Sequence, residues 1–182
     1  DMNLSVKKVE ANRNFANKIW NAGRFVISAL EKAPDKPQSD PQWTPADEYI
    51  HARMRKTIRD VNRLFESFQF GEAGRQIYEF FWGEFADWYI ECAKFQLKQG
   101  GDRAFYTAWT LMRVLDRCLR HLHPFTPYVT EELWGHLKAI ATSKGNDYKA
   151  EDGWAKALIV AQWPGSKVEE EWEKEAIGTF IT

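Results

Sequence analysis

Apolar residues recur at every third or fourth position over most of the chain, a spacing typical of helices that bury one face. The first such stretch runs from about Ser5 to Lys32, and its apolar stripe includes Phe15, Ile19 and Val26. Ser5 precedes the stripe and is the expected N-cap of this helix. The pattern therefore predicts one long amphipathic helix at the start of the chain.

Proline-rich and glycine-rich breaks divide the rest of the chain into further helical stretches. A stretch with four prolines at residues 33–45 predicts a loop. The amphipathic pattern then predicts helices over about 45–68, 72–98, 102–122 and 126–142. Thr44 and Asp102 are the expected N-caps of the first and third of these helices. An extended run is expected at 157–164, and an acidic helix near Val168.

These elements indicate an all-α protein, because long amphipathic helices joined by short polar breaks bury their apolar faces against one another. We expect an antiparallel bundle of about five helices in residues 1–164, with a short extended segment at its end. Residues 165–182 are expected to begin a further helix that the end of the sequence cuts. The chain is therefore interpreted as part of a longer polypeptide.

The composition is that of a folded protein without a strong overall charge. Of the 182 residues, 44% are hydrophobic and 28% are charged, which excludes a globally disordered chain. The net charge is −1, so an anion can be bound only through a local concentration of positive charge. Cys92 and Cys118 lie in apolar helical patterns without a CxxC spacing, which favours reduced core thiols and a cytoplasmic location. No apolar run is long enough to span a membrane, so no membrane partner is expected.

The polar face of the first helix is unusual in its residue types. Its members follow one another at spacings of three and four: Glu10, Arg13, Asn17, Asn21, Arg24 and Ser28. Asparagine is a poor helix former, whereas solvated helix faces usually carry Glu, Lys and Gln. Asparagine amides and arginine guanidinium groups suit base edges, stacking and phosphate contacts. A solvated face and a nucleic-acid-binding face both remain open at this point.

The second predicted helix concentrates positive charge. Between positions 53 and 63 it carries five basic residues and one acidic residue: Arg53, Arg55, Lys56, Arg59, Arg63 and Asp60. A row of cations along one helix can follow a phosphate backbone without reading its sequence. A solvated face explains the same pattern, and acidic residues gather near the C-terminus, at 169–171 and 173.

No set of side chains has the pattern of a catalytic or metal-binding centre. The carboxylates of the third helix lack a nucleophile or base beside them, so we interpret them as salt-bridge partners. They are Glu79, Glu84, Asp87 and Glu91. His121 and His123 have no third ligand at a supporting spacing, and the end of a helix explains both. Trp134 and Trp163 are expected in the core, and neither a catalytic residue nor a metal site is assigned.

Five segments, taken in order, resemble one known family. They are NRNFANKIWNAGRFV (residues 12–26), ADEYIHARMRKTI (46–58), YEFFWGEFADWYIECAK (78–94), LRHLHPFTPYVTEELW (119–134) and VAQWP (160–164). Together they are similar to the anticodon-binding domain of valyl-tRNA synthetases, which are class I aminoacyl-tRNA synthetases. Glu48 and Tyr49 depart from the family's usual arginine and tryptophan, so a flat ring is kept and a positive charge is lost. The HIGH and KMSKS signatures of the catalytic domain are absent from the sequence.

The resemblance implies a helical domain that holds the anticodon stem-loop of valine tRNA. A catalytic domain elsewhere in the same chain would attach valine to the tRNA, with ATP and Mg²⁺ as its cofactors. No cofactor is expected in this part of the enzyme. The expected partners are tRNA and the catalytic and C-terminal domains of the same chain, and a monomer is expected.

The resemblance also assigns six residues to the tRNA interface: Asn17, Asn21, Arg24, Tyr49, Arg53 and Lys56. The first three would read bases, Tyr49 would stack on a base, and the two cations of the second helix would contact phosphates. Every valine anticodon has A in the middle and C in the third position, so two bases must be read and one ignored. An isoleucyl or leucyl anticodon domain and a helical protein-interaction module are the alternatives.

Overall fold

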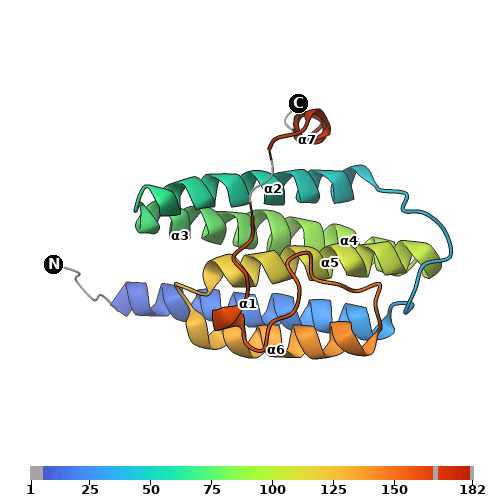
Figure 1. Cartoon of the computed structure of the whole chain (residues 1–182), viewed down its shortest axis with the longest axis horizontal. Coiled ribbons are helices and arrows are strands. Elements are labelled where there is room, and N and C mark those ends of the chain that lie inside the picture. Colours follow the sequence, from blue (N-terminus) through green and yellow to red (C-terminus); the bar gives the residue numbers. More distant parts are fainter. Residues whose placement is uncertain (1–5, 166–167, 181–182) are drawn as a thin grey trace.

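Helices form most of the protein in the computed structural model, which describes residues 6–165 and 168–180 (Figure 1). Four of the long helices are α1 (Val6–Lys32), α2 (Pro45–Glu66), α5 (Gly101–Leu122) and α6 (Pro127–Ser143). Another starts as α3 (Phe70–Glu79), continues through the π-helical segment η1 (Phe80–Tyr89) and ends as α4 (Ile90–Leu97). The described residues form no β-strand, so the predicted all-α class is confirmed.

The long helices lie side by side along a common direction (Figure 1). Helices that follow one another in the chain run in opposite directions, as predicted. The helices α1 and α6 run in the same direction. Two contacts show this: Gly23 faces Leu133 midway along both helices, and beyond their C-terminal ends Lys144 Nζ donates to the Ala33 carbonyl oxygen at 2.6 Å. A Cβ atom on Gly23 would lie 2.3 Å from Leu133 Cδ2, so this close approach of the two helices requires glycine.

The helix starts show which local sequence signals hold. Thr44 Oγ1 accepts from the Asp47 backbone N–H at 3.2 Å, and the Asp47 carboxylate accepts from the Thr44 N–H at 2.9 Å. The predicted N-cap at Thr44 is therefore confirmed, as a capping box. The predicted cap at Asp102 is wrong, because Gly100 with φ +70° takes that place. The Asp102 carboxylate instead accepts from a backbone N–H of the proline-rich loop at 2.7 Å, and Ser5 lies outside the described residues.

The segment after α6 differs from its prediction. Leu158–Val160, expected to be extended, forms one turn of 3-10 helix, η2, although the flanking Ala157 and Ala161 are extended. The Glu131 carboxylate of α6 accepts hydrogen bonds from the first two backbone N–H groups of this turn, at 2.7 and 3.1 Å. A carboxylate at the start of a helical turn satisfies N–H groups that have no partner within the turn, which stabilises η2.

The last helix, α7 (Glu171–Gly178), packs against α2. It begins later than the expected Val168, because Glu173 and the residue before the helix form a capping box. Glu173 is fully buried and pairs with Arg55 at 3.1 Å and with Arg59 at 2.8 Å. These two ion pairs hold α7 on the basic side of α2.

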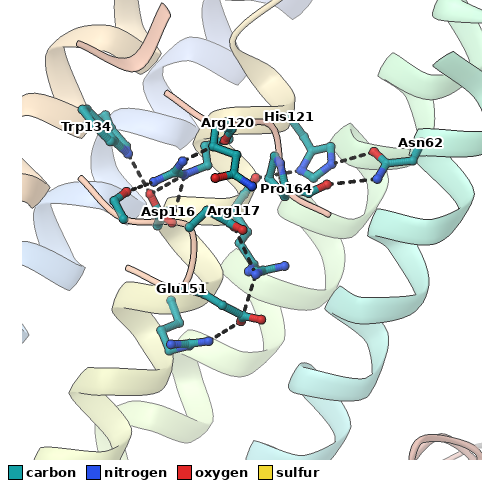
Figure 2. Close-up of polar contacts among 12 residues, drawn as sticks. Asn62, Asp116, Arg117, Arg120, His121, Trp134, Glu151 and Pro164 are labelled. Carbon is teal, nitrogen blue, oxygen red and sulfur yellow. Dashed lines mark hydrogen bonds and ion pairs between the residues drawn. The ribbon is translucent and has the colours of Figure 1, made fainter. Parts of the chain in front are cut away.

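A buried ion pair ties the C-terminal segment to α5 (Figure 2). Arg120 Nε donates to Asp116 Oδ1 at 2.9 Å, and both side chains are almost fully buried. The other two nitrogens of this guanidinium group donate to the backbone oxygens of Gln162 and Gly153, at 2.8 and 2.6 Å. Trp134 Nε1 donates to the same Asp116 oxygen at 2.7 Å, and its predicted place in the core is confirmed.

Phe68 lies directly after α2 in the left-handed region, with φ +58°. The Gln69 N–H donates to the Leu64 oxygen at 2.8 Å and the Phe68 N–H to the Phe65 oxygen at 3.0 Å, a Schellman motif that usually contains glycine. A side chain in this conformation costs about 1–2 kcal/mol. We therefore expect Phe68→Gly to raise the free energy of unfolding by about 1 kcal/mol in urea denaturation. A decrease would show that the Phe68 ring itself stabilises the fold.

Candidate nucleic-acid interface

The outer face of α1 carries the three residues predicted to read bases. Asn17, Asn21 and Arg24 are exposed, and their side chains have no hydrogen-bond or ion-pair partner within the described part of the chain. The opposite face of α1 is buried, as the apolar stripe that includes Ile19 and Val26 predicts. Burial of that stripe fixes the rotation of α1, so the two amides and the guanidinium group face solvent with free donors and acceptors.

A second strip of α1 residues adjoins Asn21 on the side of η1 and α4. Lys18 and Phe25 lie three positions before and four positions after Asn21, which places all three on one side of the helix. Lys18 pairs with Asp87 of η1. Phe25 is half-buried, and the Lys94 ammonium group of α4 lies 5.8 Å from its ring centroid. Asn21 is thus bordered by an aromatic ring and by cations.

Arg24 lies on the other side of this face, toward α6. It lines a pocket of about 650 Å³ between α1 and α6, together with Trp20, Glu31 and His136. The Trp20 and His136 rings lie 6.4 Å apart in an edge-on arrangement. A guanidinium group in this place can stack on a base or reach a phosphate next to a nucleotide held at Asn21.

The predicted stacking residue and arginine of α2 are engaged with neighbours. The Arg53 guanidinium group donates to both carboxylate oxygens of Glu84, at 2.7 and 2.6 Å, and this bond raises the pKa of Arg53. Tyr49 donates to Glu84 at 3.4 Å, and burial raises the pKa of its hydroxyl group. Its ring contacts Trp88 and Phe180, with centroids 5.1 and 4.8 Å away. Glu84 therefore has the salt-bridge role that the sequence predicts.

The positive charge predicted on α2 is compensated within the protein. Lys56 pairs with Asp60 at 2.7 Å, and Arg63 pairs with the same carboxylate at 3.0 Å. Arg55 and Arg59 pair with acidic residues in and before α7, namely Glu169, Glu170 and Glu173. The basic helix therefore offers less free positive charge to a phosphate backbone than its sequence suggests.

The six predicted residues do not form one cluster. Lys18 of α1 pairs with Asp87 and Arg53 of α2 pairs with Glu84, so α1 and α2 contact η1 from two sides. The three α1 residues share one exposed face, whereas the three α2 residues lie across η1 from them. The α1 group keeps its polar side chains free of partners among the described residues, so it is the stronger candidate.

The prediction from sequence omits Lys18, Phe25 and Lys94. A signal for the first two exists, because positions 14, 18, 21 and 25 form a strip with helical spacing beside the polar face. Lys94 could not be found in this way, since only the packing of α4 against α1 brings it to the Phe25 ring.

This arrangement suits the recognition of an unpaired nucleotide. An amide offers a donor and an acceptor to a base edge, a half-exposed ring offers a stacking surface, and ammonium groups attract phosphates. In residues 6–165 and 168–180, no three His, Cys, Asp or Glu side chains are grouped so that they could hold a metal ion. No helix in the described part of the chain has the length and apolar character needed to cross a lipid bilayer.

Comparisons with known proteins show the family to which the chain is similar. The family described as "Anticodon-binding domain of tRNA ligase" matches residues 47–181. A valine–tRNA ligase of Dehalococcoides mccartyi is 47% identical over 138 residues, which cover 76% of this chain and 15% of that protein. A valine–tRNA ligase of Bacillus subtilis is 39% identical over 166 residues, which cover 90% of this chain and 17% of that protein. The predicted resemblance is confirmed, and the chain spans only a small part of the length of these relatives.

Proposed function

Because the chain belongs to the family of anticodon-binding domains of tRNA ligases, we propose that it serves a valine–tRNA ligase and holds the anticodon stem-loop of valine tRNA. The observation that carries this proposal is the exposed α1 face around Asn21, whose amide has no partner among the described residues and shares one side of the helix with Lys18 and the half-buried Phe25 ring. The anticodon as ligand is inferred from the family, and valine as the amino acid is inferred from the relatives.

The bases of an anticodon loop are unpaired, so a protein can reach both their edges and their faces. Asn21, with Asn17 one turn before it, would bond the edge of the middle adenine, which presents one donor and one acceptor. Phe25 would stack on a neighbouring base. Lys18 and Lys94, which share the carboxylates of Asp87 and Glu91, would add a weaker attraction to the adjoining phosphates without selectivity.

Arg24 would contact a base or phosphate on the α6 side of the same face. The α2 group of Tyr49, Arg53 and Lys56 would contribute less, because its cations must share their carboxylate partners with RNA. Arg24→Ala is therefore expected to weaken valine-specific binding more than Lys56→Ala. Equal losses on valine and non-valine loops would refute base reading by Arg24.

The whole ligase would attach valine to its tRNA with ATP and Mg²⁺, in a catalytic part outside these residues. This domain would catalyse no step. It would hold the anticodon so that the acceptor end of the same tRNA reaches the catalytic part. We further propose that the ligase acts as a monomer in the cytoplasm.

Substitutions on α1 separate base reading from stacking. Asn21→Ala should weaken binding of the valine stem-loop roughly fivefold to 150-fold, which is about 1–3 kcal/mol, and should barely affect a loop with G in the middle. Phe25→Ala should weaken both loops, since stacking tolerates any base. Fluorescence anisotropy measures both effects, and Asn146→Ala removes an exposed amide elsewhere as the matched control. Equal losses on both loops in Asn21→Ala would show that Asn21 does not read the middle base.

The third anticodon base distinguishes the proposed amino acid from its alternatives. Valine, isoleucine and the leucine codons that begin with C all place A in the middle of the anticodon, but their third bases are C, U and G. Three stem-loops that differ only there should bind in the order C first, then U and G. Preferential binding of the U or G loop would assign the domain to an isoleucyl or leucyl enzyme.

A further inference from the structure

The α2–α3 turn and the α5–α6 turn lie at the end of the bundle where α1 begins (Figure 1), and their aromatic side chains form a cluster. It comes from the α2–α3 turn, the α5–α6 turn and the segment after η2, and we name it the end cluster: Phe65, Phe68, Phe70, Phe125 and Trp163. The Phe65 ring centroid lies 5.3 Å from that of Phe70, 6.0 Å from that of Phe125 and 4.9 Å from that of Trp163. Phe68 lies 6.1 Å from Phe70.

Most of this cluster faces solvent. Phe68 is 80% exposed and Phe70 47%, while Phe125 and Trp163 are 38% and 37% exposed. The prediction that Trp163 lies in the core is therefore wrong: its Nε1 donates to Asn62 at 2.7 Å, and part of its ring remains open. Single exposed rings are common, but contiguous exposed apolar side chains mark interaction sites.

Two backbone features present these rings. Phe68 occupies the left-handed position of the Schellman motif, where glycine is usual. A Cβ atom on Gly74 would lie 2.9 Å from Phe125 Cε1, so the Phe125 ring rests directly against α3. The strained backbone at Phe68 carries a ring that is 80% exposed, and such a ring contributes little to the core of this domain. A strained residue with an exposed side chain points to a role in an interaction.

We propose that the end cluster is the surface on which this domain docks against the aminoacylating part of its own ligase chain. The inference rests on the proposed function, under which this domain belongs to a ligase as long as its relatives. The chain covers 15% and 17% of two of these relatives, so most of such a ligase, a much larger body, lies outside these residues. A large apolar surface on that body is the occupant that the end cluster fits.

The course of α1 links this end of the bundle to that body. Phe15 lies 4.2 Å from Tyr78 and Lys94 lies over Phe25, so α1 runs parallel to α3 and α4. The first turns of α1 are therefore level with the start of α3, beside the end cluster (Figure 1). Any polypeptide joined before α1 in the ligase would be tethered at this end. The other end of the described chain is remote, because Phe180 contacts Tyr49 near the start of α2.

The charge beside the end cluster argues against RNA as its occupant. Glu66 borders Phe68, is exposed, and has no ion-pair partner among the described residues. A free carboxylate repels phosphates, whereas the free amides that suit RNA lie farther along α1, at 17 and 21. An apolar centre with a polar border is instead the usual form of a protein–protein contact.

The test compares Phe68→Ser with Tyr128→Ser in the full-length ligase. Tyr128 is 91% exposed at the start of α6, so its loss removes a similar exposed ring outside the end cluster. We expect Phe68→Ser to lower kcat for tRNA aminoacylation about fivefold or more, because aromatic residues dominate such contacts. ATP–pyrophosphate exchange and affinity for the valine stem-loop should stay unchanged. Tyr128→Ser should change none of the three.

Phe68→Gly separates docking from instability, because it is expected to stabilise the domain and must still lower kcat for aminoacylation. Unchanged kcat in both Phe68 variants, with the stem-loop still bound, would overturn the docking proposal alone. A dimer of the 182-residue chain in sedimentation, dissociated by Phe68→Ser, would overturn it in favour of a second copy. A ligase that does not bind the valine stem-loop would instead refute the proposed function, and the docking proposal with it.

Discussion

Asp116→Ala is expected to lower the free energy of unfolding by about 3–5 kcal/mol. The substitution leaves the Arg120 guanidinium group buried without its counter-charge and the Trp134 N–H without its acceptor (Figure 2). Both side chains are almost fully buried, so water does not solvate this pair, and this burial raises the pKa of the Asp116 carboxyl group. Removing one partner of a buried pair costs more than the pair contributes, because the remaining charge cannot return to water.

Urea unfolding followed by tryptophan fluorescence measures this loss. Glu79→Ala is the matched control, because it breaks an ion pair with Arg75 in which both side chains are more than half exposed. The control should cost less than about 1 kcal/mol. If both variants lost equally little, the Arg120 guanidinium group would have found another partner, and the two backbone oxygens that it binds would suffice to hold it.

Acidification from about pH 7 to about pH 5 is expected to cost about 2 kcal/mol for each of two buried histidines, His51 and His121. Burial lowers the pKa of both imidazoles to about 4 in the folded protein. The unfolded value is about 6.5. Between these values the unfolded chain binds more protons than the folded one, so stability falls as the pH falls through this window. Below about pH 4 both states are protonated, and these histidines cause no further loss.

The surroundings of both imidazoles explain why they stay neutral. His121 Nδ1 donates to the Arg117 carbonyl oxygen at 2.9 Å, and His51 Nε2 bonds to Thr110 Oγ1 at 3.1 Å. Arg113 beside His51 and Arg117 beside His121 further oppose a positive ring.

An NMR titration of the imidazole protons, together with urea unfolding at each pH, tests whether the two buried histidines stay neutral and lower the stability on acidification. The signals of His51 and His121 should stay constant down to about pH 5, while unfolding becomes easier. Ordinary titration of both buried rings near pH 6.5, with no loss of stability, would contradict the assignment.

Local signals in the sequence predict much of this fold. The stripe through Ile19 and Val26 is buried because helical periodicity needs no tertiary information. The cap at Thr44 is correct because a capping box closes within four residues. Helical periodicity also predicts that Asn17, Asn21 and Arg24 on the outer face of α1 are exposed, as they are.

The features that were missed depend on contacts between distant residues. Asp102 does not cap α5, because glycine at position 100 reaches a positive φ without cost and the loop after α1 takes up the Asp102 carboxylate. Within the run at 157–164, residues 158–160 form a 3-10 turn because Glu131 of α6 caps it. The charge of α2 is neutralised by acidic residues more than a hundred positions later, as in the Arg55–Glu170 pair. Periodicity along one helix contains none of this information.

The measurement that tests the central claim most directly is a titration of this domain with a valine anticodon stem-loop and with the same loop carrying G in place of the middle A, each at two salt concentrations. Base reading by the α1 face predicts tighter binding of the valine loop at both salts, because an amide–adenine contact survives screening of the phosphates. Equal binding of the two loops that weakens alike with salt would contradict it, since the domain would then contribute only backbone affinity.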